Sequence, residues 1–295
     1  MYRITIIVFY LWIIFSCAND LEQNSLGADY VGTSESLDII TWNIENFPKQ
    51  NALTIDSLAS LINILDVDII AMQEIGSELY FMQLIDKLKG WSGQKTEGSY
   101  GLAYIYKSDL KINKLSPILE LDNYNLVRTP YMLELNWFGE IIYIINNHYK
   151  CCGNGIIENY YNDEEYRRLQ ACILTEEYIR NELENKNVIL LGDFNDELSD
   201  LDSANVFNIF LNQVDSYKFV DLDISLGSSN NWSFPSWPSH LDHILITNEL
   251  FDEFDNIGSM VKTIPIENYF LGGWNHYENL ISDHRPLVIR LIFNN

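Results

Sequence analysis

The chain has few basic side chains: 18 Lys and Arg stand against 42 Asp and Glu, for a formal net charge of -24 over 295 residues. The acidic residues are spread along the sequence and are not gathered in one tail. Tight nonspecific binding of long nucleic acid needs a basic face, so this balance weighs against a DNA-packaging protein. It still allows an enzyme that holds a phosphate chain briefly in a metal-loaded, locally positive cleft.

Cysteine is also scarce, with four residues in the chain. Cys17 follows an apolar leader, which leaves Cys151, Cys152 and Cys172. Adjacent cysteines lack the usual spacing of zinc ligands, and no second Cys or His pair accompanies them. We therefore expect one structural disulfide, with Cys172 as a candidate partner, in preference to a cysteine metal site.

No apolar run is long enough for a comfortable membrane span, and the run from Ile4 to Phe15 has the proportions of an export signal. Ile14-Phe15-Ser16-Cys17 resembles a bacterial lipobox, in which Cys17 becomes the lipidated first residue. Ordinary cleavage and an uncleaved anchor are the alternatives. The sequence predicts a signal peptide at 1–16, a polar linker at 17–37 and one folded domain at 38–295. The protein would be exported, either as a cell-envelope lipoprotein on the periplasmic or outer-membrane face or as a secreted protein.

Hydrophobic residues make up 47% of the chain, enough for a large core, and we find no internal repeat or low-complexity segment. Helical spacing of apolar residues predicts helices over 53–65, 79–88 and 164–183. Such a mixture of helices with hairpins and crossovers predicts an α/β fold without the strict alternation of a TIM barrel. The expected strands are Ile39–Trp42, Ile69–Met72, Leu102–Tyr106, Tyr131–Leu135, Ile141–Ile145, Val188–Leu191, Ile244–Thr247 and Leu287–Phe293.

Polar and acidic residues recur where these apolar runs stop. Any one of them would be an ordinary turn residue. Their recurrence at four successive strand ends favours side chains that a rigid scaffold presents to one cleft. The residues are Asn43, Glu45, Glu74, His148, Asp193 and Asn195.

Six segments, in chain order, resemble the motifs of the endonuclease/exonuclease/phosphatase superfamily over about Asp38 to Asn295. They are Thr41-Trp42-Asn43-Ile44-Glu45-Asn46, Gln73-Glu74, Asn147-His148, Gly192-Asp193-Phe194-Asn195, Leu241-Asp242-His243 and Ser282-Asp283-His284-Arg285-Pro286. The resemblance implies a deoxyribonuclease I-like, four-layer α/β sandwich in which helices flank two packed mixed β-sheets. It also implies that 38–295 is a catalytic domain that hydrolyses phosphate esters with Mg²⁺ or, as an alternative, Mn²⁺.

The resemblance implies roles that fit the chemistry of phosphate-ester hydrolysis. His284 would accept a proton from the attacking water or donate one to the phosphate, while Asp242 would orient its ring. Glu74 is the best hard-oxygen ligand for Mg²⁺; Glu45 and Asp283 are further candidates for ligands or supporting groups, with a surface acid as the alternative for Glu45. Asp193 would polarise the water or the leaving oxygen. Asn195 and Asn43 would donate amide hydrogen bonds, and His148 would contact the phosphate.

Arg128 and Tyr100 resemble family positions that bind substrate, and a guanidinium suits phosphate because it donates two parallel hydrogen bonds. The aromatic residues Trp232, Phe234 and Trp237 would stack on the substrate or form local core. The leading interpretation is a monomeric nuclease acting on DNA or RNA and tethered to a membrane through Cys17. A phosphodiesterase or phosphatase for lipid head groups or inositol phosphates is the first alternative, and a noncatalytic envelope binding lipoprotein is the second.

Overall fold

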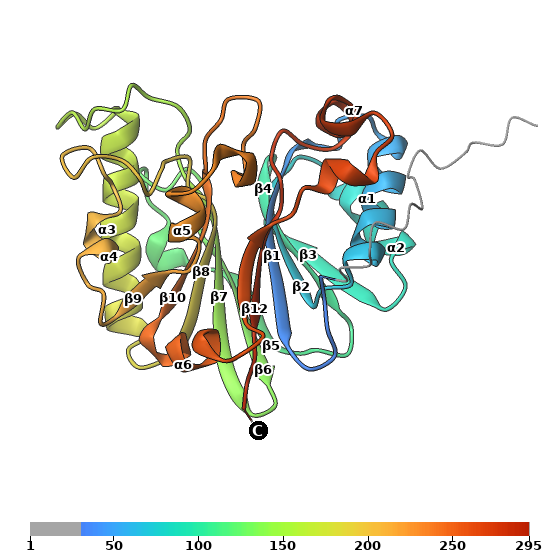
Figure 1. The fold of residues 1–295 in the computed structure, drawn as a ribbon, viewed down its shortest axis with the longest axis horizontal. Coiled ribbons are helices and arrows are strands. Elements are labelled where there is room, and N and C mark those ends of the chain that lie inside the picture. The colour runs from blue at the N-terminus through green and yellow to red at the C-terminus, as the bar shows by residue number, and fades with distance from the viewer. Residues whose placement is uncertain (1–30, 295) are drawn as a thin grey trace, which may run out of the picture.

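Two six-stranded sheets pack face to face in the computed structural model, which describes residues 31–294 (Figure 1). The strand orders are β11-β12-β1-β2-β4-β3 and β5-β6-β7-β8-β10-β9. Each sheet is mixed, because β1 pairs with β2 and β7 pairs with β8 in parallel while the other pairs are antiparallel. The predicted α/β sandwich of two mixed sheets flanked by helices is confirmed.

The strands are β1 (Leu37–Phe47), β2 (Ile69–Ile75), β3 (Trp91–Lys95), β4 (Gly101–Lys107), β5 (Lys111–Pro117), β6 (Tyr131–Trp137), β7 (Glu140–His148), β8 (Asn187–Asp193), β9 (Tyr217–Phe219), β10 (Asp242–Thr247), β11 (Met260–Thr263) and β12 (Leu287–Leu291). The helices are α1 (Ala52–Leu65), α2 (Glu78–Lys87), α3 (Glu164–Glu182), α4 (Asn208–Leu211), α5 (Leu222–Ser225), α6 (Phe251–Asp255) and α7 (Gly273–Leu280). Short 3-10 turns lie at Leu119–Leu121, Ser229–Asn231, Asn248–Leu250 and Ile266–Tyr269.

All eight strands and three helices that the sequence predicts are present. The sequence analysis missed β3, β5, β9 and β11, which are short or lie at sheet edges, so they lack a continuous apolar run. Helices α4, α5, α6 and α7 were not predicted either; they are short, with eight residues in α7 and four or five in the others. Helix α3 begins where expected because the Asp163 carboxylate accepts a hydrogen bond from Tyr166 N at 2.7 Å, which caps the first turn.

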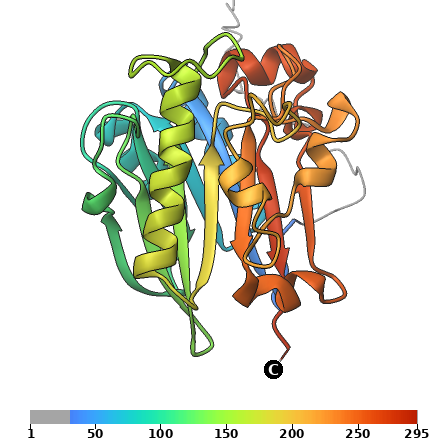
Figure 2. The ribbon, with the colours of Figure 1, turned by 90° about the vertical axis from the view of Figure 1, so that its left-hand side faces the viewer.

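Alternating side chains of the central strands fill three separate cores. Ile39 points between the sheets, where it joins residues such as Ile144 of the facing sheet. Ile40 points outward against α1 and α2, and Leu190 points outward against α3. Figures 1 and 2 show the resulting layers, with α1 and α2 outside one sheet and α3 outside the other. Burial on both faces explains why these strands read as unbroken apolar runs.

A buried polar bridge joins the two sheets at the level where the strands end. Gln73 Nε2 in β2 donates to Asn146 Oδ1 in β7 at 2.7 Å. The amide nitrogen of Asn146 donates back to the carbonyls of Met72 at 3.0 Å and Ala103 at 3.1 Å. Since buried amides must find partners, these bonds define one position of the sheets relative to each other.

The segment before β1 contacts the domain within the described residues. Gly32 N donates to Leu65 O at 3.0 Å, and Val31 is buried. The predicted signal peptide at 1–16, the lipidated Cys17 and the linker up to residue 30 lie outside the described residues. Among residues 31–294, no helix combines the length and the apolar character needed to span a membrane.

The predicted disulfide is wrong. Cys172 lies on the inward face of α3, fully buried in the core beneath that helix. Cys151 and Cys152 lie on the exposed segment that follows β7, and all three sulfurs are free. The helix packing that buries Cys172 separates it from the two exposed cysteines, so its thiol serves as a small apolar core group.

Replacing Asn146 tests the polar bridge. Asn146→Leu keeps the approximate size of the side chain. It removes one acceptor of Gln73 Nε2, which keeps its bond to Thr41 Oγ1 at 3.1 Å, and it removes the amide donor to the Met72 and Ala103 carbonyls. Each unsatisfied buried group is costly, so the free energy of unfolding should fall by about 3 kcal/mol. Urea unfolding measures it, with Asn113→Leu on the exposed face of β5 as the control, expected within about 0.5 kcal/mol of wild type. Equal effects of the two changes would contradict a structural role for the bridge.

Candidate active site

Four strand ends converge because of the sheet topology. The carboxyl ends of parallel neighbours lie at the same edge of a sheet. In one sheet, Asn43 of β1 lies opposite Gln73 of β2, the residue before Glu74. In the other sheet, His148 of β7 lies opposite Asp193 of β8. The face-to-face packing then brings both edges together, so that Asn43 Nδ2 donates to Asp193 Oδ2 across the sheets at 2.8 Å.

Antiparallel neighbours supply the rest of the site from their amino ends. Asp242, the first residue of β10, lies opposite Asp193 in the ladder. Leu287, the first residue of β12, pairs with Thr41 of β1, which places the turn that carries His284 at the same rim. Ser282 holds that turn: its hydroxyl donates to Asn43 O at 2.6 Å and accepts from His284 N at 3.0 Å.

These residues line one cleft. Of the predicted site residues, Asn43, Glu45, Glu74, His148, Asp193, Asn195, Asp283 and His284 line it, and Asp242 lies directly behind His284. The other lining residues were not predicted as part of the site: Asn46, Cys151, Cys152, Ser239 and Leu241. Phe234 and Trp237 line the cleft as well, whereas Trp232 donates its indole N–H to Ile224 O and belongs to the local packing.

An imidazole between two carboxylates forms the centre of the cleft. Nδ1 of His284 lies 2.7 Å from Asp242 Oδ2, and its Nε2 lies 3.9 Å from Asp193 Oδ2. Burial alone would lower the pKa of His284, but the neighbouring carboxylates, Asp242 foremost, outweigh it and raise the pKa to about 10. The ring is therefore protonated at neutral pH, with Nδ1–H bound by Asp242 and Nε2–H facing the cleft.

The Asp193 carboxylate is buried at the end of β8 and interacts with His284 of the other sheet. Burial raises the pKa of Asp193 to about 7, while the His284 cation opposes part of the shift. Its other oxygen accepts from Asn195 N at 2.9 Å, which holds the carboxylate in place. The amide of Asn195 donates to Tyr149 O at 3.3 Å, so Asn195 shapes the strand end that carries Asp193.

His148 lies deep in the cleft. Its Nε2 is 3.5 Å from Asp193 Oδ2 and 3.8 Å from Glu74 Oε1. Burial lowers the pKa of His148 well below its ordinary value, so the ring is neutral. A neutral ring can donate one hydrogen bond without adding charge to the site.

Three carboxylates at the rim are the candidates for metal ligands. Glu74 accepts from Asn46 N at 2.9 Å and from Asn43 Nδ2 at 3.4 Å, which aims it into the cleft. Glu45 forms an ion pair with Lys49 and accepts from Asp283 N at 3.0 Å. Since Lys49 already neutralises Glu45, Glu74 is the stronger candidate.

The donor set fits a hard divalent cation. Asp283 Oδ1 and Asp242 Oδ1 are buried oxygens without a hydrogen-bond donor among the described residues. Burial raises the pKa of Asp283 to about 6, and the repulsion from the Glu45 carboxylate adds to the shift. A cation that prefers oxygen ligands, such as Mg²⁺, would relieve this repulsion, and Glu74 with Asp283 would hold it.

The two predicted substrate-binding residues lie beside the cleft. Arg128 Nε donates to the carbonyl of Tyr100 at 2.7 Å. Burial lowers the pKa of Arg128, whereas Glu74 and Asp193 act in the opposite direction, which places the guanidinium within electrostatic reach of both. The ring of Tyr100 is 44% exposed, and its described contact with this region is made by its backbone.

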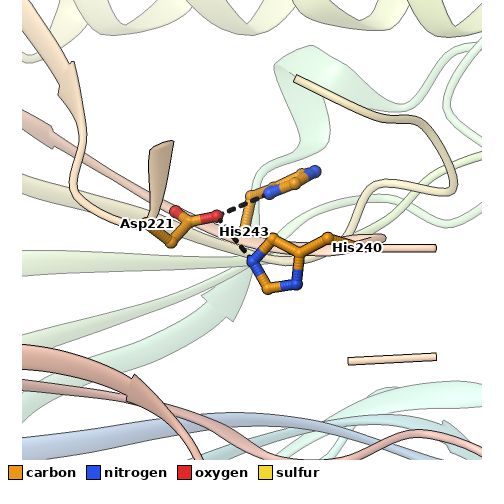
Figure 3. Close-up of side chains that lie close together, drawn as sticks. All are labelled: Asp221, His240 and His243. Carbon is orange, nitrogen blue, oxygen red and sulfur yellow. Dashed lines mark hydrogen bonds and ion pairs between the residues drawn. The ribbon is translucent and has the colours of Figure 1, made fainter. Parts of the chain in front are cut away.

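Asp221, His240 and His243 form a second buried cluster, in which both rings contact the Asp221 carboxylate (Figure 3). Ser233 N donates to His240 Nδ1 at 3.2 Å, so the proton of this ring is on Nε2, which donates to Asp221 Oδ2 at 3.1 Å. His243 lies between two acceptors, the Asp221 carboxylate at 2.7 Å and a backbone carbonyl at 2.9 Å, so both its nitrogens carry protons. These hydrogen bonds join the two rings and the Asp221 carboxylate into one buried network.

Ser233 connects this network to the cleft. Its hydroxyl accepts from Leu241 N at 3.1 Å and from Asp242 N at 3.2 Å. Its carbonyl accepts from Arg285 N at 2.7 Å, next to His284. The sequence analysis missed this role of Asp221, His240 and Ser233, for which the only sequence signal was a second histidine two residues before Asp242.

Two packed mixed sheets with a polar cleft at one rim define the class of α/β sandwiches to which the chain belongs. The model of the Endonuclease/Exonuclease/phosphatase family matches residues 40–284, and the chain belongs to this family. The predicted family resemblance is thereby confirmed, and the family supports a hydrolase of phosphate esters. A comparison with curated proteins found no match.

Solved structures show the same fold at low sequence identity. A humanized TDP2 of D. rerio is 15% identical, with a TM-score of 0.64 over 89% of this chain and 100% of that one. A mannosyl-6-phosphatase of Bacteroides thetaiotaomicron is 17% identical, with a TM-score of 0.59 over 88% of this chain and 100% of that one. A family protein from Bacteroides vulgatus is 16% identical, with a TM-score of 0.59 over 88% and 99%.

The Asp221 network should stabilise the protein in a defined pH window. Burial alone would raise the pKa of Asp221, but His243 and His240 lower it below the ordinary value of 3.8, so its contribution is present above about pH 4. Burial alone would lower the pKa of His243, but Asp221 raises it above 6.5, so that contribution is present below about pH 6.5 and is lost as the pH rises.

Asp221→Asn should therefore lower the free energy of unfolding by about 3 kcal/mol, the cost of breaking a buried ion pair, most strongly between pH 4 and 6.5. Urea unfolding at a series of pH values measures this loss. Asp223→Asn, on an exposed residue of the same short helix, is the matched control. A loss that does not change with pH would refute the charged pair.

Proposed function

We propose that the chain hydrolyses phosphate esters by in-line attack of water in the cleft around His284, with a divalent cation. The observation that carries this proposal is the alignment Asp242–His284–Asp193, in which a buried imidazolium faces the cleft from between two carboxylates. Membership of the Endonuclease/Exonuclease/phosphatase family supports it. The noncatalytic alternative is disfavoured because it gives no reason to gather these costly buried charges in one cleft.

Asp193 and His284 would act as general base and general acid, respectively. Asp193, with a pKa of about 7, is poised to take the proton of the attacking water. His284 holds its proton at Nε2, where it can donate to a phosphoryl or leaving oxygen as negative charge develops there. Asn43 and His148 hold Asp193 in position from the opposite sheet and its own sheet, respectively.

Glu74 and Asp283, with Glu45 in support, would hold the cation. A bound Mg²⁺ or Mn²⁺ supplies positive charge that neutralises the phosphoryl oxygens. Arg128 would add a second positive group from the side, where its Nε is already anchored to Tyr100 O. With that Nε engaged, Nη1 and Nη2 stay available for a phosphate oxygen.

For the substrate, nucleic acid is the first choice. Phe234 and Trp237 line the cleft beside the catalytic residues, and aromatic faces bind bases without sequence preference. The phenyl ring of Phe234 lies 4.9 Å from the His284 ring, and the Trp237 side chain is 77% exposed. A similar structure, TDP2 of D. rerio, is complexed with a single-strand DNA product.

A smaller phosphate ester, such as a lipid head group, an inositol phosphate or a sugar phosphate, is the second candidate. The net charge of -24 disfavours long polyanions. A mannosyl-6-phosphatase shares the fold.

Export, the lipid anchor on Cys17 and a monomeric state remain predictions. Mass spectrometry of the membrane-extracted protein would detect the acyl chains on Cys17.

His284→Ala tests the proposed centre. Loss of the proton donor should lower the hydrolysis of bis(p-nitrophenyl) phosphate in Mg²⁺ by roughly 10²- to 10⁴-fold. His276→Ala, on α7 and outside the cleft lining, is the matched control and should keep the activity. Equal unfolding curves would show that both variants fold. An active His284→Ala protein, or an inactive wild type with every substrate tested, would refute the proposal.

Glu74→Gln tests the cation. Replacing a carboxylate oxygen by an amide should raise the Mg²⁺ concentration for half-maximal activity by roughly tenfold or more, while saturating Mg²⁺ restores part of the rate. Glu78→Gln, on the exposed first turn of α2, is the control. The same assay with plasmid DNA, RNA, sphingomyelin, inositol phosphates and mannose 6-phosphate ranks the substrates. An unchanged Mg²⁺ requirement in Glu74→Gln would place the cation elsewhere.

A further inference from the structure

Two adjacent cysteines lie in the lining of the cleft, and the proposed hydrolysis gives them no task. Cys151 and Cys152 follow β7 three and four residues after His148, and both are exposed. The Sγ atom of Cys152 lies 2.9 Å from that of Cys151. The third described cysteine, Cys172, is fully buried and cannot react without opening of the core.

The two sulfurs have different surroundings. Cys152 donates its S–H to Cys151, and this hydrogen bond, together with burial, raises the pKa of Cys152. The ammonium of Lys150 lies 3.9 Å from Cys151 Sγ and is bound to Cys151 O at 2.9 Å. Cys151 Sγ accepts this hydrogen bond and lies beside the Lys150 ammonium, so we assign Cys151 as the attacking sulfur and Cys152 as the one that follows.

The backbone that carries the pair is connected to the site. Arg168 Nη1 donates to Lys150 O at 2.8 Å and to Cys152 O at 2.6 Å. The same guanidinium forms an ion pair with Asp196 at 2.7 Å, next to Asn195 at the end of β8. Arg168 and Asp196 are both buried, so a change in the Cys151–Cys152 backbone is transmitted to the strand end that carries Asp193.

A bond between adjacent cysteines would disturb that backbone. Disulfides usually join Cα atoms at least about 4.4 Å apart, whereas neighbours in a trans chain are separated by about 3.8 Å. Cys152 already has a left-handed φ of 71°, and Gly153 follows with a φ of 119°. Because Arg168 Nη1 binds the Cys152 carbonyl, a change in this backbone disturbs that hydrogen bond. Strained, exposed disulfides of this kind are easily reduced again, which is the behaviour of regulatory bonds.

We propose that Cys151 and Cys152 form a reversible dithiol–disulfide pair that reacts with low-molecular-weight disulfides and controls the cleft. The Cys151 thiolate attacks one sulfur of the disulfide and releases the first small thiol. Cys152 then loses its proton, attacks Cys151 Sγ and releases the second small thiol. Two protein thiols are oxidised to one disulfide, and one small disulfide is reduced to two thiols.

Oxidised glutathione, applied to the reduced full chain and followed by alkylation and peptide mapping, tests the pair. Wild type should lose the mass of two hydrogens, with the bond mapped between Cys151 and Cys152, and dithiothreitol should restore both thiols. Cys152→Ser should stop at a stable glutathione adduct on Cys151, because the second sulfur is missing. Cys151→Ser should form little adduct. A wild type that keeps two thiols or accumulates adducts, or equal adducts in the two variants, would overturn the proposal.

The control of the cleft rests on the proposed function and is measured separately. Oxidation should lower phosphodiester hydrolysis by roughly tenfold, since small misplacement of catalytic groups is costly, and reduction should restore it. The double variant Cys151→Ser/Cys152→Ser should not respond to oxidised glutathione. If the bond forms and the rate is unchanged, the pair does not control the cleft. If no form of the protein hydrolyses any substrate, the proposed function fails while the thiol result stands.

Discussion

The hydrogen bonds that cross between the two sheets are the constraint on which the site depends. Asn43 reaches Asp193, and below it Gln73 reaches Asn146. Neither sheet contains a complete site, because Glu74 and the His284 turn belong to one rim, and His148, Asp193 and Asp242 to the other. Apolar packing between the sheets is non-directional, so it is these buried amides, each needing a partner, that select one relative position.

The charges that this sheet arrangement brings together determine the chemistry of the cleft. Carboxylates from both sheets lie in one partly buried cleft, where burial first and neighbouring carboxylates second raise the pKa of Asp193 and of Asp283. The cleft tolerates this crowding because His284 is a buried cation and because oxygens remain available for a divalent ion. A protein of net charge -24 thus builds a site for a phosphate group from locally arranged positive charge.

Much of this could be predicted from the sequence, for reasons that particular residues make plain. Asn43, Glu74, His148 and Asp193 follow the apolar runs of central strands that are buried on both faces, so the pattern revealed the strands and the polar residues after these runs together. Strands β3 and β5 lie at sheet edges with polar faces and gave no such pattern. The Asp221–His240–Ser233 network depends on loops that only the tertiary fold brings together. The disulfide prediction failed because cysteine count and compartment do not reveal which side of α3 faces the core.

The central claim is that side chains from both sheets form one cation-loaded cleft. A crystal of the protein soaked in Mn²⁺ and measured at the manganese absorption edge tests it most directly. We expect one anomalous peak in contact with a Glu74 oxygen, in the cleft that His284 and Asp193 face. A peak at a distant acidic cluster, or an empty cleft at saturating Mn²⁺, would contradict it.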